Sequence, residues 1–159
     1  MITTDLQQLL ESGVSMLVGT RDAQCRPCCM RGMGARVAAA GAELVVFLPD
    51  ATSAATLANL RDNGRIAVCF SRPFDHHSVQ IKGRLSDLAP ATADDHAWIE
   101  RYRGGLAESL AFVGLPVSTT LRIAHWPSHA ARFRVEHLFV QTPGPHAGQP
   151  LEAGRGPSR

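Results

Sequence analysis

Residues 65–85 read RIAVCFSRPFDHHSVQIKGRL, and this stretch decides the class of fold. Apolar and β-branched side chains dominate 65–71, whereas 78–85 alternates valine and isoleucine with glutamine and lysine. Because successive side chains of a strand point to opposite faces, this alternation is typical of a strand with one face in the core. A turn at Pro73-Phe74-Asp75 separates the two segments, so they are predicted to form a strand pair.

Further strands and helices are predicted on both sides of this pair. The strands are expected at 14–20, 30–37, 43–48, 121–126 and 131–141, and the helices at 4–13, 52–63 and 91–110. In the last helix, Thr92 is the expected N-cap and the Gly104-Gly105 pair is expected to interrupt the helix. Short strands with few helices between them favour a mainly β, closed barrel over a parallel sheet.

The length of 159 residues fits one domain, which is large enough to bury a core without disulfide or metal staples. We place this domain at 1–141. The remaining residues, 142–159, are rich in glycine and proline and almost free of apolar side chains. Such a composition predicts a disordered tail.

The formal net charge is only +2, which argues against nucleic acid or a membrane surface as the main partner. The N-terminal residues lack a basic segment followed by an apolar run, and no stretch approaches the length of a membrane span. The four cysteines are therefore expected to be thiols, and the protein is expected to be cytoplasmic. A small molecule remains the expected partner.

Several catalytic motifs are absent from the sequence. There is no Gly-x-Gly-x-x-Gly, no Walker loop, no Gly-x-Ser-x-Gly and no metalloprotease His-Glu pattern. The sequence therefore gives no support for hydrolase or nucleoside-triphosphatase chemistry, and no residue can be assigned as a catalytic acid or base.

Three segments together resemble a known family. They are Leu17-Val18-Gly19-Thr20 with Arg26-Pro27, then residues 57–68 (LANLRDNGRIAV), and then residues 78–85. Their order is similar to that of the flavin-binding split-barrel family of pyridoxamine-phosphate-oxidase-like proteins, over about residues 14–88. The resemblance implies a six-stranded antiparallel split barrel with a few flanking helices, assembled as a homodimer.

The resemblance also implies a cofactor at the subunit interface, with FMN first and haem or a deazaflavin as less favoured choices. Arg31 and Arg36 stand at the positions where the family carries basic residues that hold the phosphate. A pair of guanidinium groups suits a phosphate dianion because bidentate hydrogen bonds add direction to charge. The helix departs from the family pattern, because Ala55 and Thr56 stand where the family typically carries an Arg-Lys or Ser-Lys pair. Each lost charge-assisted bond is worth about 1.5–3 kcal/mol.

Three hydroxyl side chains are further candidates for cofactor binding. Thr52 and Ser53 lie at the expected start of a helix, where the helix dipole favours an anion. Ser78 matches a position where some family members direct a polar side chain toward the flavin ring. Capping and turn formation are the alternative interpretation of all three residues.

Several cysteines and histidines are candidate metal or haem ligands. Cys25, Cys28 and Cys29 include a Cys-x-x-Cys spacing, but no second pair completes a zinc site, so ordinary thiols are expected and no metal site is predicted. His125 and His129 are separated by Pro127, which argues against a shared helix face. A single histidine suffices as an axial haem ligand, so these residues and His76-His77 keep a haem-binding relative open.

We therefore expect an FMN-dependent oxidoreductase of the split-barrel type that acts on an unknown small molecule. The substrate would lie against the flavin near Trp126. The second hypothesis is a cofactor-poor binding or interaction protein with the same fold, and the third is a haem-binding relative. Pyridoxamine-phosphate oxidase activity itself is not expected, because the Pro- and Gly-rich ending lacks the Trp and Arg segment with which that enzyme closes over its substrate.

Overall fold

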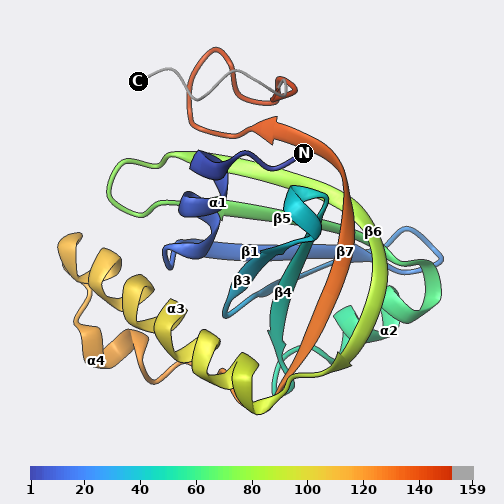
Figure 1. The fold of residues 1–159 in the computed structure, drawn as a ribbon, viewed down its shortest axis with the longest axis horizontal. Coiled ribbons are helices and arrows are strands. Elements are labelled where there is room, and N and C mark those ends of the chain that lie inside the picture. The colour runs from blue at the N-terminus through green and yellow to red at the C-terminus, as the bar shows by residue number, and fades with distance from the viewer. Residues whose placement is uncertain (152–159) are drawn as a thin grey trace.

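Seven strands pair antiparallel throughout and form one curved sheet in the order β2-β1-β5-β6-β7-β4-β3 (Figure 1). The computed structural model describes residues 1–151. The strands are β1 Ser15–Arg21, β2 Pro27–Arg31, β3 Ala35–Ala38, β4 Glu43–Pro49, β5 Arg65–Ser71, β6 Ser78–Pro90 and β7 Ser128–Val140. The helices are α1 Thr4–Glu11, the short 3-10 turn η1 Ala39–Gly41, α2 Ala54–Asn63, α3 Ala93–Phe112 and α4 Val117–Thr120.

The predicted strand pair at residues 65–85 is confirmed as β5 and β6. Val68 of β5 lies opposite Ile81 of β6, and both are fully buried. β6 continues beyond the predicted end to Pro90 and pairs with β7 over almost its whole length. Figure 1 shows these two long strands curving side by side, and they connect the two halves of the sheet.

The core lies inside this curved sheet. Alternate residues of β1, β5 and β6 enter it, as do residues of β4 and β7, and α1 adds leucines from one end. The buried members with the largest side chains include Phe70, Phe133, Met16, Leu44, Leu48, Leu10 and Ile81. The alternation of apolar and polar residues in the sequence therefore predicts correctly which side chains face the inside of the barrel.

Residues 1–151 contain seven strands, not the six that we expected. The segment predicted as one strand at 30–37 is two strands, β2 and β3, which lie at opposite edges of the sheet. The break between them falls at Gly32-Met33-Gly34. A Cβ at Gly32 would lie 2.6 Å from Met16 Cε, and one at Gly34 would lie 2.9 Å from Phe47 Cδ2. The two glycines therefore let the chain leave one edge and cross close to the core.

The strand predicted at 121–126 is wrong. The backbone N–H groups of Leu121, Arg122 and Ile123 donate to carbonyl oxygens three or four residues earlier, in a turn that follows α4. These donors are used locally and cannot join a strand ladder. The segment instead runs from α4 to the start of β7.

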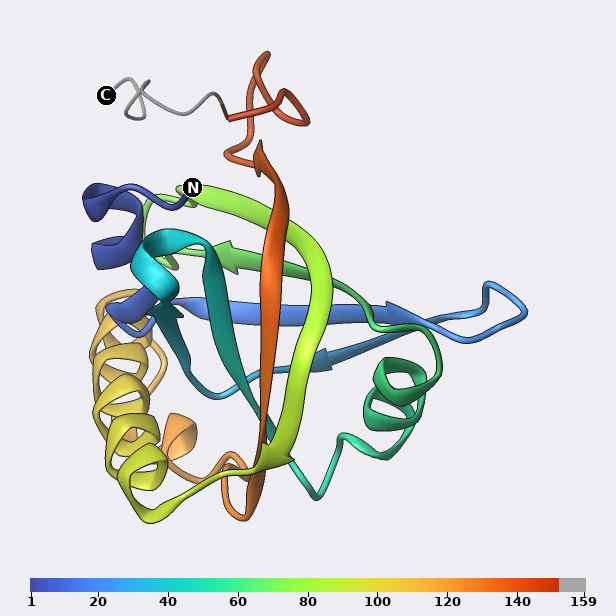
Figure 2. The ribbon, with the colours of Figure 1, turned by 45° about the vertical axis from the view of Figure 1, so that its right-hand side comes forward.

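The interruption predicted for the third helix is also wrong, because α3 runs unbroken through Gly104 and Gly105. Its start is as predicted, with Thr92 as N-cap in a capping box with Asp95. Gly105 allows close packing, since a Cβ there would lie 2.5 Å from the Ser12 carbonyl oxygen. α2 and α3 lie on opposite sides of the barrel in both ribbon views (Figures 1 and 2). No helix among residues 1–151 combines the length and apolar character needed to cross a membrane.

Residues 142–151 differ from the predicted disordered tail. They turn back along the end of β7, where the N–H of Val140 donates to the Gln149 carbonyl and that of Leu151 to the Leu138 carbonyl. Leu151 also packs against the core. A single apolar residue and a few backbone bonds therefore order a segment whose composition predicts disorder. The rest of the predicted tail, 152–159, lies outside the described residues.

Candidate functional site

A groove of about 440 Å³ opens between the end of β2, the loop from β4 to α2, and the segment that follows α4. This volume is within the range of ligand pockets, about 300–1,000 Å³. Two of the residues predicted to bind a cofactor, Arg31 and Thr52, line the groove. The other lining residues are Cys29, Met30, Met33, Pro49, Ile123 and Ala124. The groove therefore combines one cation and one hydroxyl with a largely apolar wall.

Arg31 is exposed at the end of β2, and its guanidinium donates to the Ser15 hydroxyl at 3.1 Å. Ser15 pairs in register with Ser71, whose hydroxyl lies 2.6 Å from that of Ser78. Because register partners point to the same side of a sheet, these residues form a polar row across the outer face. The row brings Ser78 onto the same face as Arg31. The Ser78 hydroxyl also donates to the His76 carbonyl at 2.7 Å, so its hydrogen bonds are made within the protein.

The N-terminus of α2 adjoins the groove and is not capped by a side chain. Ser53 is the N-cap residue, is fully buried, and has a hydroxyl oxygen without a hydrogen-bond partner. Thr52, its neighbour, is exposed. The first N–H groups of a helix have no intrahelical partner, and the helix dipole makes this end attractive to anions. The uncapped start of α2 therefore suits a phosphate at this end of the groove. Ser53 itself is buried and is not among the residues that line the groove.

Arg36 does not join this group. Its guanidinium donates to Asp95 Oδ1 at 2.8 Å and lies over the rings of Phe47 and Trp98, at 5.8 and 5.7 Å from their centroids. The glycine-containing break after Arg31 carries Arg36 to the opposite edge of the sheet. The spacing that suggested a shared phosphate site therefore does not place the two arginines together within this chain.

The partner of Arg36 is held in the first turn of α3. Burial raises the pKa of Asp95, but hydrogen bonds from the Thr92 backbone N–H and hydroxyl, together with Arg36, outweigh burial and leave this pKa below its ordinary value of 3.8. The carboxylate is thus ionised and shared between a helix cap and an ion pair. This arrangement gives Arg36 a structural contact between β3 and α3.

The two departures from the family pattern have different positions on α2. Thr56 is fully buried, with its hydroxyl 3.6 Å from Cys28 Sγ, whereas Ala55 is exposed. Neither residue supplies a cation at the start of the helix. Arg31 is thus the cation that the groove offers to an anionic group.

All four cysteines are free, as expected. Cys25 and Cys29 are exposed at and near the hairpin between β1 and β2. Burial raises the pKa of the Cys69 thiol, and the nearby Cys29 adds to this effect. Within residues 1–151, none of the four belongs to a group of side chains arranged as metal ligands. The interpretation of the hairpin cysteines as ordinary thiols stays a prediction.

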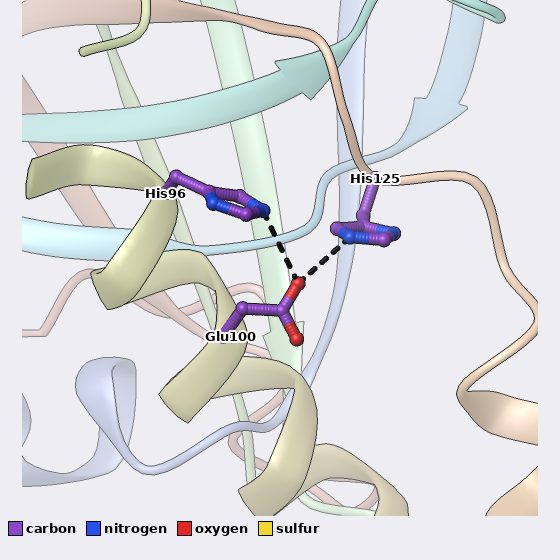
Figure 3. Close-up of side chains that lie close together, drawn as sticks. All are labelled: His96, Glu100 and His125. Atoms are coloured by element: carbon purple, nitrogen blue, oxygen red, sulfur yellow. Dashed lines mark ion pairs between the residues drawn. The ribbon is translucent and has the colours of Figure 1, made fainter. Parts of the chain in front are cut away.

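The structure gathers a second polar group that the sequence did not reveal, made of His96, Glu100 and His125 (Figure 3). His96 and Glu100 are four residues apart on α3, and His125 lies in the segment before β7. The four-residue spacing within a predicted helix is a signal for the first two, because residues i and i+4 share a helix face. His125 could not be placed beside them, since its segment was predicted as a strand.

No protein-family model matches the sequence, and no curated protein matches it. Solved structures do match. HupZ of Group A Streptococcus aligns with a TM-score of 0.58 and 19% identity over 93% of this chain and 100% of the other. An F420 reductase aligns with a TM-score of 0.57 and 16% identity, over 83% of this chain and 94% of the other. An FMN-binding protein of Syntrophomonas wolfei aligns with a TM-score of 0.52 and 11% identity, over 94% of this chain and 85% of the other.

These alignments define the class of fold. The chain has the fold of the FMN-binding split-barrel proteins that are related to pyridoxamine 5'-phosphate oxidase. The resemblance read from residues 14–88 is therefore confirmed at the level of the fold. Among these structural neighbours are proteins named for FMN and for F420, a deazaflavin.

Proposed function

We propose that this protein binds FMN at a site shared between two copies of the chain and acts as an oxidoreductase on a small molecule. The observation that carries the proposal is the groove in which Arg31 and Thr52 meet beside the uncapped N-terminus of α2. Its contents fit the two ends of FMN, which has an anionic phosphate and an apolar, planar ring system.

The phosphate would be held by Arg31, Thr52 and Ser53. Arg31 supplies the charge, and its planar guanidinium can form two parallel hydrogen bonds to phosphate oxygens. The Thr52 hydroxyl donates to the Pro49 carbonyl over a long 3.5 Å, a weak bond that a phosphate oxygen can replace. The unpartnered Ser53 oxygen marks a buried polar position at the helix start. Such positions are costly unless a partner satisfies them, so a bound anion would stabilise this end of α2.

The apolar wall of the groove, which includes Met30, Met33 and Ile123, suits the flavin ring. Methionine side chains are flexible and polarisable, so they adapt well to a flat aromatic surface. FMN would supply the hydride-transfer chemistry, and the chain would contribute binding, orientation and the exclusion of water. Trp126 is partly exposed at the end of the segment that carries Ile123, and we keep it as the expected wall of the substrate site.

The outer face of β1 supports a homodimer. Leu17 is 46% exposed there, in the interior of the sheet rather than at an edge, and its neighbour on the same face is Gly19. Cys69 lies opposite Leu17 on the adjoining strand β5. The exposed Leu17 side chain thus lies among small side chains next to Arg31, its partner in register. A second copy on this face would cover the leucine and complete the groove.

A second candidate is a cofactor-poor binding protein, and the Arg36–Asp95 ion pair favours it. The pair removes one of the two arginines expected at the phosphate, and the first turn of α2 offers no basic residue in its place, since its one arginine, Arg61, lies in the last turn. FMN held by a single arginine would bind more weakly by the value of the missing charge-assisted bonds, about 1.5–3 kcal/mol each. A haem-binding protein is the third hypothesis. Within residues 1–151 the groove is lined by no histidine, so the groove itself offers no axial haem ligand of that type.

Titration of FMN fluorescence with Thr52→Asp and its neutral control Thr52→Asn tests the site. An acidic residue at a helix start stabilises the helix, so the aspartate variant should fold at least as well as the wild type. The same carboxylate would repel the phosphate, and like charges brought together cost several kcal/mol. We expect FMN affinity to fall by at least about 10-fold in Thr52→Asp and to change little in Thr52→Asn. Equal FMN affinity in all three proteins would place the phosphate elsewhere, and an absence of FMN binding in all three would favour the cofactor-poor candidate.

A further inference from the structure

We propose that His96, Glu100 and His125 form a binding site for a divalent transition-metal ion of the Zn²⁺ type, separate from the flavin groove. The three side chains come from α3 and from the segment before β7, and Figure 3 shows a ring nitrogen of each histidine directed to the same oxygen of Glu100. One ligand atom from each residue lies within 4.8 Å of the others. Two imidazoles and one carboxylate form a donor set that Zn²⁺ accepts in proteins.

The distances are close to those that a bound ion needs. With metal–ligand bonds of about 2.0–2.1 Å, neighbouring ligand atoms in a tetrahedral site are roughly 3.3 Å apart. His96 Nε2 lies 3.5 Å from Glu100 Oε1, which already meets this requirement. His125 Nε2 lies 2.7 Å from the same oxygen and would have to withdraw by roughly half an ångström. A side-chain rotation of this size needs no movement of the backbone.

Neighbouring groups hold the three side chains in place by hydrogen bonding and packing, as they do around metal ligands in proteins. Arg103 is almost fully buried and donates to both Glu100 oxygens at 2.7 Å, which fixes the carboxylate plane. The Nδ1 atom of His125 lies 3.3 Å from the Ile123 carbonyl oxygen. When a metal ion replaces the Nε2 proton that faces Glu100, a proton kept on Nδ1 and directed to that carbonyl would hold the ring with its Nε2 lone pair toward the ion. The His96 ring packs against Trp126, with their centroids 4.4 Å apart.

Hydrogen bonding alone does not account for this convergence. Glu100 Oε1 faces Arg103 and His125 at 2.7 Å each, which uses its two lone pairs. His96 Nε2, at 3.5 Å from the same oxygen, has no well-placed protein acceptor. An ion placed among the three side chains would give every one of these nitrogen and oxygen atoms a partner.

The site is open to solvent on one side, since the side chains of His96 and Glu100 are 42% and 44% exposed. Water or a small ligand can therefore fill a fourth coordination position. A bound ion would also connect α3 to the segment whose Ile123 and Ala124 line the groove. The proposal does not depend on FMN, because none of the three ligands lines that groove.

Competition between the full-length protein and a chromophoric zinc indicator measures the affinity for Zn²⁺, and the visible spectrum of added Co²⁺ reports coordination. We expect one ion per chain. Loss of a group that hydrogen-bonds to a metal ligand lowers metal affinity by about 10–100-fold, and replacing a ligand itself should lower it by at least as much. His96→Ala and His125→Ala should each show this loss, together with loss of the Co²⁺ bands. His137→Ala is the matched control, because His137 is exposed on β7 and outside the cluster.

The two histidine variants are chosen because they leave the Arg103–Glu100 ion pair intact. Substitution of Glu100 would leave the buried Arg103 without its carboxylate and could unfold the chain. Far-UV circular dichroism of His96→Ala and His125→Ala should match the wild type. Wild-type affinity for Zn²⁺ in either variant, or an equal loss in His137→Ala, would overturn the proposal and indicate adventitious binding to surface histidines.

Discussion

Arg36 donates to Asp95 at 2.8 Å, and this ion pair joins β3 to the first turn of α3. The Asp95 side chain is 9% exposed and that of Arg36 is 35% exposed, so the pair is partly screened by solvent. Its role in the structure differs from that of Arg31, which borders the groove without an acidic partner among the ion pairs of residues 1–151. The two arginines therefore allow stability and cofactor binding to be tested separately.

Arg36→Ala should lower the free energy of unfolding by about 1 kcal/mol, which is the value of a charge-assisted bond reduced for solvent screening. FMN affinity should change by less than about 2-fold, because Arg36 is outside the groove. Urea denaturation and FMN titration measure the two effects. A loss of FMN affinity with unchanged stability would show that Arg36 reaches the phosphate, as its sequence position first suggested.

The pH dependence of stability should contain a contribution from Asp95. Its pKa in the folded protein is below 3.8, so the stabilisation is present above that ordinary value and is lost as pH falls through the lower folded value. Asp95→Asn should therefore be less stable than the wild type at neutral pH, and the difference should shrink in strongly acidic solution. Urea denaturation of both proteins from pH 7 down to about pH 2 measures this difference. A difference that does not vary with pH would contradict the assignment.

Gly104 and Gly105 are neighbours on α3 with opposite expected responses to alanine. A Cβ at Gly104 meets no atom within 4 Å, so Gly104→Ala should stabilise the helix by about 1 kcal/mol. A Cβ at Gly105 would lie 2.5 Å from the Ser12 carbonyl oxygen, so Gly105→Ala should destabilise the fold by about 1–3 kcal/mol. Thermal denaturation measures the stability of the two variants, and each variant serves as the control for the other. Similar effects of both changes would mean that α3 does not approach Ser12 closely.

Leu17 offers a test of the proposed homodimer. Leu17→Arg places a charge on the exposed face of β1, where a second copy would otherwise bury the leucine. We expect the wild type to be a dimer and the variant to be a monomer of unchanged secondary structure, measured by size-exclusion chromatography with light scattering. His137→Arg, on the exposed part of β7, should remain dimeric. A wild-type monomer, or a dimer that tolerates Leu17→Arg, would remove this face from the interface.

The parts of the fold predicted correctly are those set by local sequence. The alternation in residues 78–85 and the Thr92 cap are decided within a few residues, and both are confirmed. The errors arise where distant contacts decide the outcome. Residues 30–37 divide because the chain must pass Met16 and Phe47, and Gly105 stays helical because α3 packs on Ser12. Residues 142–151 are ordered by pairing with β7, which their composition does not predict.

The candidate site was only partly accessible from sequence for the same reason. Arg31 and Thr52 share a groove, as a common role in cofactor binding requires, although that role remains a prediction. The partner of Arg36 comes from a residue 59 positions away, which no spacing rule indicates. His125 lies in an irregular segment, so its approach to α3 depends on tertiary structure alone.

The visible spectrum of the purified protein, recorded after addition of FMN and removal of unbound flavin, tests the central claim most directly. We predict that the wild type retains a two-band flavin spectrum, that Arg36→Ala retains it as well, and that Arg31→Ala loses it. A colourless wild-type protein after the same treatment would contradict the proposed FMN site and leave the cofactor-poor binding protein as the better account of this fold.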